Sequence, residues 1–305
     1  MKQIGNTFLF SLLSISVFAQ GGAKTGNEKN SLLWKITGNG LEKPSYLYGT
    51  IHMLCADDAV FSDSLKNVIS RCDEVYLEVN INDIMEMMGV MGQMKMRDDT
   101  TLTDLLSEEE YKKVKKYFDE KSPLLPFSVL ETFKPILAAS TLAGSSFDCE
   151  STVMMEQLIV EEAEKNDKKV KGLESMAYQA GILDSIPYKL QAMELVKYIE
   201  NIDKAKGEDT ELNDLMEAYK QQNLEKMEEL MMKSDAGINS YTELLLYKRN
   251  RNWVKKLKTL MPAKSLVIAV GAGHLPGEQG VINLLRKEGF TVTPVENKIT
   301  KIKSI

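Results

Sequence analysis

The sequence contains few of the residues on which several classes of protein depend. Among its 305 residues there are three cysteines and two histidines. Three cysteines allow at most one internal disulfide, and none of them has the C-x-x-C spacing of a thiol-redox enzyme or a zinc ribbon. We therefore expect Cys55, Cys72 and Cys149 to act as small buried hydrophobic side chains.

An excess of positive charge is also absent, and so is any long apolar run after the N-terminus. The 38 lysines and arginines are outnumbered by 44 acidic residues, which gives a net charge of −6. Because nucleic-acid-binding proteins normally carry a basic surface, we expect no nucleic-acid partner. A membrane-spanning helix needs about 20 predominantly apolar residues, so we expect no transmembrane segment in the mature chain.

The N-terminus has the pattern of a secretory signal peptide. Lys2 precedes an apolar stretch at residues 8–19 that ends in Val-Phe-Ala. We expect cleavage near Ala19 and export to the periplasm or the exterior. An N-terminal anchor helix is the alternative, but the apolar stretch is short for that role. A polar, glycine-rich linker is expected at 20–31 and a short tail at 299–305.

Residues 32–298 are expected to form a single α/β domain. Two strands at 32–36 and 45–51 flank the turn Gly38-Asn39-Gly40, which predicts an N-terminal β-hairpin. Large helical insertions are expected at about 82–165 and 176–260. Within this domain, the patterning predicts further strands at 74–79 and 169–173, helices at 62–72, 103–118 and 154–166, and three or four more helices in 188–260.

The C-terminal part predicts how strands are arranged in the sheet. The apolar run at 265–270 is typical of a strand buried on both faces. A loop at 271–277, a helix at 278–288 and a strand at 290–295 follow it, which predicts a parallel β-α-β crossover. We therefore expect an α/β fold with a mixed, partly parallel sheet, an N-terminal hairpin and a large helical middle region.

Both histidines, His52 and His274, occupy a Gly-x-x-His frame at the end of a predicted strand. Glu78 ends a third strand, and functional groups of open α/β sheets gather at the carboxyl edge. Two imidazoles and a carboxylate can bind a divalent metal that activates water, with Glu78 as a ligand or as the general base. The glycines allow a ligand to approach the backbone closely. Two half-buried structural histidines are the alternative.

Several other catalytic motifs are absent. Neither histidine belongs to a His-Glu-x-x-His motif, and no Gly-x-Ser-x-Gly elbow is present. The Gly271-Ala272-Gly273 segment resembles a dinucleotide-binding loop, but Pro276 replaces its third glycine. These absences argue against a helix-borne zinc protease, a serine hydrolase of the elbow type and an NAD-binding enzyme.

Four segments together resemble the TraB/GumN family, which includes the Tiki metalloproteases. In chain order they are Gly-Thr-Ile-His at 49–52, Gly-Leu-Glu-Ser at 172–175, Arg-Asn at 249–250 and Gly-His-Leu-Pro-Gly at 273–277. The resemblance implies a fold related to erythromycin-esterase-like and ChaN-like proteins. It also implies a metal-dependent peptidase, with Mn, Co or Zn held by His52, His274 and Glu78, which would also be the catalytic residues.

Two further residues lie in recurring segments of this family. The resemblance suggests that Glu174 and Arg249 bind substrate. Glu174 could instead be a second metal carboxylate or a helix N-terminal charge, and Arg249 could instead pair with an internal acid. The expected function is an exported metal-dependent hydrolase acting on a peptide or small molecule. A metal-independent His/Glu hydrolase or transferase and a non-catalytic peptide-binding or regulatory protein are the alternatives.

A methionine-rich segment interrupts the predicted helical region. Six methionines lie within residues 85–96, where Gly89 and Gly92 separate them. Helical spacing favours a buried face that fills the core. A lid hinged at the glycines, an adaptable apolar surface and a Cu(I) site are the alternatives.

Overall fold

The computed structural model describes residues 30–121, 125–142, 149–204, 211–233 and 240–298. The predicted signal peptide at 1–19, most of the predicted linker and the tail at 299–305 lie outside these residues. Within the described part of the chain, no helix is both long and apolar enough to cross a membrane.

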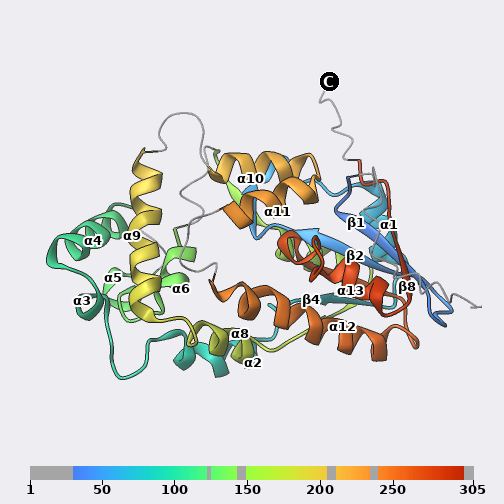
Figure 1. Ribbon diagram of the computed structural model, residues 1–305, viewed down its shortest axis with the longest axis horizontal. Helices are drawn as coiled ribbons and strands as arrows, with labels where there is room; N and C mark the ends of the chain where they lie inside the picture. The colour runs from blue at the N-terminus through green and yellow to red at the C-terminus, as the bar shows by residue number, and fades with distance from the viewer. Residues whose placement is uncertain (1–29, 122–124, 143–148, 205–210, 234–239, 299–305) are drawn as a thin grey trace, which may run out of the picture.

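A six-stranded mixed sheet organises the fold, with the strand order β6-β4-β7-β2-β1-β8 (Figure 1). Neighbours from β6 to β2 run parallel, whereas β1 is antiparallel to both β2 and β8. The expected mixed, partly parallel α/β fold is confirmed. The strands are β1 (Leu33–Gly38), β2 (Ser45–Thr50), β4 (Glu74–Leu77), β6 (Lys169–Gly172), β7 (Leu266–Gly271) and β8 (Phe290–Pro294).

The predicted hairpin and crossover are both present. Gly38, Asn39 and Gly40 have positive φ angles in the turn between β1 and β2, a conformation that glycine and asparagine tolerate. Helix α13 (Val281–Lys287) connects β7 to β8. The crossover passes over β2 and β1, so β7 pairs with β2 and β4 rather than with β8. This central position buries β7 on both faces.

A second, two-stranded sheet joins β3 (Met53–Cys55) to β5 (Thr152–Met154) in antiparallel register. It lies outside the main sheet, and the sequence pattern did not predict it. Met53 pairs with Met154, so the chain just after His52 lies beside the chain just before Glu156.

Most of the helices contribute to one of two hydrophobic clusters. The sheet packs with α1 (Asp63–Arg71), α7 (Met155–Lys165), α10 (Glu211–Lys220), α11 (Leu224–Lys233), α12 (Lys248–Leu260) and α13. A separate cluster, at the opposite end of the molecule from the hairpin (Figure 1), contains α3 (Leu102–Leu105), α4 (Glu108–Lys121), α5 (Phe127–Leu130), α6 (Pro135–Ser140) and α9 (Tyr188–Lys204). Helices α2 (Ile84–Val90) and α8 (Met176–Leu183) pack against each other between these groups.

A buried lysine ties α6 to the end of α8. The Lys134 side chain is completely buried, and its Nζ lies 2.8 Å from Asp184 Oδ1. The same Nζ donates to the Ala180 carbonyl oxygen at 2.7 Å. A buried ammonium is tolerated only when it is paired and hydrogen-bonded, so these contacts fix where the helical cluster attaches.

The helix predicted at 103–118 is divided in two. Helix α3 ends at Leu105, and α4 begins at Glu108. Ser107 explains the break, because its N–H donates to the Glu110 carboxylate at 2.8 Å and its Oγ accepts from the Glu110 N–H at 3.3 Å. This reciprocal capping starts a new helix at a residue where the periodic pattern predicted continuity.

The cysteine prediction is correct for Cys72 and wrong for the other two. Cys72 is buried with a free thiol. Cys55 and Cys149 form a disulfide that spans 94 positions of the sequence. The pairing of β3 with β5 brings these two cysteines together, and local spacing carries no sign of that long-range contact.

Core filling is also wrong for most of the methionine-rich segment. Four of its methionines are exposed: Met85 (79%), Met87 (41%), Met88 (66%) and Met91 (59%). Val90 and Met96 are the buried apolar residues of the segment. Helix α2 turns Glu86 inward, where its carboxylate accepts the Met176 N–H at 2.7 Å. Periodic spacing identifies one face of a helix, but it does not show whether another element covers that face.

Removing the disulfide should destabilise the fold. A Cys55→Ser/Cys149→Ser variant, or reductant on the wild type, releases a constraint on a long loop of the unfolded chain. We expect the free energy of unfolding to fall by about 2–5 kcal/mol in chemical denaturation. Cys72→Ala is the control. Because Cys72 is not in the disulfide, the difference in unfolding free energy between this variant and the wild type should be the same with and without reductant. An unfolding curve of the wild type that reductant leaves unchanged would contradict the assigned pairing.

Candidate active site

The three predicted core residues of the site follow the carboxyl ends of three adjacent strands. Strands β2, β7 and β4 are adjacent and parallel, so their carboxyl ends lie together. His52 follows β2, Glu78 follows β4 directly, and His274 ends the 3₁₀ turn η6 (Ala272–His274) after β7. The Nε2 of His274 lies 3.7 Å from Glu78 Oε1.

Glycines of both Gly-x-x-His frames are needed for close packing at this edge. The Gly271 N–H donates to Glu78 Oε1 at 2.8 Å, and a Cβ on Gly271 would lie 3.2 Å from that oxygen. A Cβ on Gly49 would lie 3.1 Å from side-chain carbons of both Ala272 and Leu275. The glycines therefore allow close packing of the protein groups that build the site.

Arg249 joins the two carboxylates of the site. Its Nη2 donates to Glu78 Oε2 at 2.5 Å, and its Nε donates to Glu174 Oε1 at 2.8 Å. Its Nη1 donates to the Leu245 carbonyl oxygen and lies 3.2 Å from His274 Nε2. All three charged side chains are at most 13% exposed. The residues predicted to bind substrate, Arg249 and Glu174, thus contact each other.

Other side chains complete this buried network. Trp253 Nε1 donates to Glu174 Oε2 at 2.9 Å. Gln179 Nε2 lies within hydrogen-bonding distance of both Glu78 and Glu174. Arg249 lies in the first turn of α12, just after the π-helical segment Glu243–Tyr247. Such segments often occur at functional sites.

The charges around Glu78 keep it ionised. Burial alone would raise the pKa of Glu78, but the charge that His274 carries once protonated at low pH, the charge of Arg249 and the Gly271 N–H lower it to about 2. Burial is also the main influence on His274, whose pKa is lowered to about 4. At neutral pH the site therefore contains a carboxylate, a neutral imidazole and a guanidinium.

Hydrogen bonds define the tautomer of His274. Its Nδ1 lies 2.6 Å from Asn250 Oδ1. Because Asn250 Nδ2 donates to the Gln279 carbonyl at 2.8 Å, the amide oxygen is the group that faces the imidazole. Nδ1 therefore carries the proton, and Nε2 presents a lone pair to the site.

The Nδ1 of His52 is also hydrogen-bonded, although the His52 side chain is exposed. Its Nδ1 lies 2.9 Å from Glu156 Oε1, and its side chain is 76% exposed. A carboxylate can only accept, so Nδ1 carries the proton and Nε2 of the neutral ring is free. The hydrogen bond to Glu156 is the main cause that raises the pKa of His52. Neither Glu156 nor Asn250 was among the predicted site residues, because Asn250 lies in the Arg-Asn segment of the resemblance without a predicted role, and Glu156 lies in none of the four segments.

Two imidazoles and a carboxylate are side chains of the types that bind divalent metals. Metal-binding histidines usually donate their second ring N–H to a carboxylate or carbonyl, as both His52 and His274 do here. Among the described residues, however, no three histidine, cysteine, aspartate or glutamate side chains are already gathered to hold a metal. The position of Arg249 explains part of this, since its Nη1 lies against His274 Nε2.

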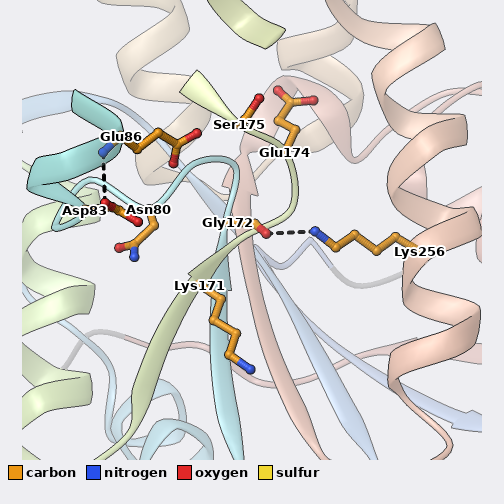
Figure 2. Close-up of a pocket in the computed structure, with 8 residues that line it drawn as sticks. All are labelled: Asn80, Asp83, Glu86, Lys171, Gly172, Glu174, Ser175 and Lys256. Atoms are coloured by element: carbon orange, nitrogen blue, oxygen red, sulfur yellow. Dashed lines mark hydrogen bonds between the residues drawn. The ribbon is translucent and has the colours of Figure 1, made fainter. Parts of the chain in front are cut away.

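A pocket of about 370 Å³ adjoins this network through Glu174. Figure 2 shows Asp83, the N-cap residue of α2, and Glu86 of α2 on one side and Lys256 of α12 on the other. Lys256 Nζ donates to the Gly172 carbonyl at 3.0 Å, which closes that side. The lining residues are Asn80, Asp83, Glu86, Lys171, Gly172, Glu174, Ser175 and Lys256. The pocket therefore lies beyond the carboxyl ends of β4 and β6.

The chain is similar in sequence to several proteins named metalloproteases. The metalloprotease TIKI2 of Danio rerio is 21% identical over 328 residues, covering 89% of this chain and 62% of the relative. Metalloprotease TIKI1 of Homo sapiens is 22% identical over 333 residues, covering 91% and 65%. The metalloprotease TIKI homolog of Amphimedon queenslandica is 22% identical over 339 residues, covering 93% and 65%. The chain thus spans less than two thirds of the length of these relatives. No solved structure matches it.

A family model extends over nearly all of the described domain. The TraB/PrgY/gumN model matches residues 32–294, which include both Gly-x-x-His frames and every site residue named above. The resemblance inferred from the four sequence segments is therefore confirmed. The chain belongs to the TraB/PrgY/gumN family.

Proposed function

We propose that this protein is an exported, metal-dependent hydrolase and that it cleaves peptides. His52 and His274 bind a divalent metal through Nε2, and Glu78 acts as a ligand or as the general base. The observation that carries this proposal is that both histidines follow adjacent parallel strands at the carboxyl edge of the sheet, each with Nδ1 hydrogen-bonded, and that His274 lies 3.7 Å from the ionised Glu78. The relatives named metalloproteases support it.

The residues of the chain prepare the site for this chemistry. A bound divalent metal would lower the pKa of a water molecule and polarise the substrate carbonyl. His274 is neutral at physiological pH, so its Nε2 lone pair is available once Arg249 Nη1 moves aside. Glu78 remains ionised and can accept a proton or a cation. Asn250 and Glu156 hold the two rings in the tautomers that metal binding requires.

Glu174 and Arg249 have different access to a substrate. Glu174 lines the pocket, so it is placed to contact a peptide side chain or a small molecule. Arg249 is buried and paired with two carboxylates, which favours the internal-pair alternative, in which it orients Glu78. Its direct contact with substrate stays a prediction, and would require exchange of one of these partners.

Two observations support export. The N-terminal residues have the pattern of a signal peptide, and the described part of the chain contains a disulfide, which is typical of proteins in oxidising compartments.

A second function has specific support. Arg249 Nη1 contacts the His274 nitrogen that a metal would need. A metal-independent His/Glu hydrolase or transferase could use this arrangement as it stands, with His52 as the exposed acid or base.

The metal requirement separates the two functions. We expect the purified protein to contain a divalent metal by elemental analysis, and His52→Ala and His274→Ala to weaken its affinity at least roughly tenfold, since even loss of an outer partner costs that much. Cleavage of a peptide library should stop on chelation and return with Mn, Co or Zn. Glu161→Gln, an exposed change on α7, is the control. Full activity in chelator, with metal content unaffected by either histidine change, would refute the metal-dependent proposal.

Metal affinity should depend on pH through His52. The pKa of His52 is raised above 6.5, and the protonated ring cannot bind a metal. We therefore expect affinity to be constant well above this pKa and to fall about tenfold per pH unit below it, as one proton competes. His274, with a pKa of about 4, should add to the fall only at much lower pH. Calorimetric titration with Mn²⁺ or Co²⁺ at several pH values measures this. Equal affinity at pH values above and below the His52 pKa would show that His52 is not a ligand.

A further inference from the structure

We propose that Glu156 is the positioning residue of His52, and that the disulfide-linked ribbon of β3 and β5 holds these two residues together. Glu156 fixes the proton on His52 Nδ1 and thereby leaves Nε2 free. The consequence for metal binding rests on the proposed function, whereas the effect of Glu156 on the imidazole does not.

The ribbon brings together two segments that are far apart in the sequence. His52 immediately precedes β3, and Glu156 is the second residue of α7, which follows β5 without a loop. Met53 pairs with Met154, and the Ala56 N–H donates to the Ser151 carbonyl at 3.0 Å. The disulfide between Cys55 and Cys149 closes the end of the ribbon remote from His52.

Glu156 contacts one Gly-x-x-His frame at two positions. Its Oε1 lies 2.9 Å from His52 Nδ1 and accepts the Thr50 hydroxyl, also at 2.9 Å. Thr50 is buried at the end of β2, so its hydroxyl anchors the carboxylate to the sheet. The anchored carboxylate then orients an imidazole that is otherwise largely exposed.

A contribution to stability alone does not explain why a glutamate stands at position 156. Its Oε2 is buried and has no hydrogen-bond partner among the described residues. A buried polar atom without a partner destabilises the folded state. The side chain of Glu156 makes one hydrogen bond with the buried Thr50 hydroxyl and one with the His52 ring. The bond with Thr50 belongs to the core, whereas the bond with the exposed His52 ring is the one that a purely structural role leaves unexplained.

The imidazole tautomers test this directly. The chain has only two histidines, so long-range ¹H–¹⁵N spectra of the metal-free, disulfide-intact protein show four ring nitrogens. Above both histidine pKa values we expect the Nδ1–H form for both rings. Glu156→Leu should abolish this preference for His52 and leave His274 unchanged, because Asn250 still holds it. Glu156→Gln keeps a carbonyl acceptor and should retain the Nδ1–H form. Glu161→Gln should change neither ring.

Stability and metal affinity provide independent readouts. Glu156→Leu removes the unpartnered oxygen but also leaves the buried Thr50 hydroxyl without its acceptor, so we expect its Tm to change little, while its Co²⁺ affinity should fall roughly 10- to 100-fold. Glu156→Gln should lose much less affinity. If Glu156→Leu does not fold, Glu156→Ala removes the same acceptor without adding bulk.

The outcomes distinguish this inference from the proposed function. An unchanged His52 tautomer in Glu156→Leu or Glu156→Ala would overturn the positioning role. A changed tautomer in a protein whose wild type binds none of Mn²⁺, Co²⁺ and Zn²⁺ would support the positioning role and refute the metal-dependent function. For the ribbon, Cys55→Ser/Cys149→Ser should give a mixture of His52 tautomers while His274 keeps one. A single, wild-type His52 tautomer in that variant would show that the disulfide does not contribute.

Discussion

The buried guanidinium of Arg249 is the constraint on which the site depends. It binds carboxylates that follow two neighbouring parallel strands, Glu78 after β4 and Glu174 after β6, and so links α12 to the carboxyl edge of the sheet. Without this cation, two carboxylates would lie buried near each other, a state that is strongly unfavourable. Its charge also helps to hold the pKa of Glu78 low. Fold and electrostatics of the edge therefore depend on the same side chain.

The sequence allowed prediction of those features that follow from the parallel arrangement. Each Gly-x-x-His frame and Glu78 ended a predicted strand, and parallel neighbours share one carboxyl edge, so their meeting at that edge could be expected. Glu156 and Asn250 could not be found in this way. Glu156 reaches His52 only because β3 and β5 pair across about a hundred residues, and a glutamate at the start of a helix resembles many others.

Local sequence patterns predicted where helices lie better than they predicted which helix faces are covered by other elements. The spacing of Leu65, Val68 and Ile69 predicts a buried face for α1, and the structure buries Leu65 and Ile69 fully and Val68 partly in the cluster around the sheet. The same reasoning was wrong for the methionines of α2, since no described element covers Met85 or Met88. Whether a periodic face is buried depends on long-range packing, which is also why the Cys55–Cys149 pairing had to come from the structure.

The disulfide has a consequence for a protein that meets proteases. It encloses the segment containing α1, β4 and Glu78, while His52 and His274 lie outside that covalent ring on opposite sides of it in the sequence. A single cut of the backbone anywhere between Cys55 and Cys149 would leave two fragments joined through sulfur, one with each histidine. The nicked molecule could keep its sheet edge assembled until a reductant released the halves.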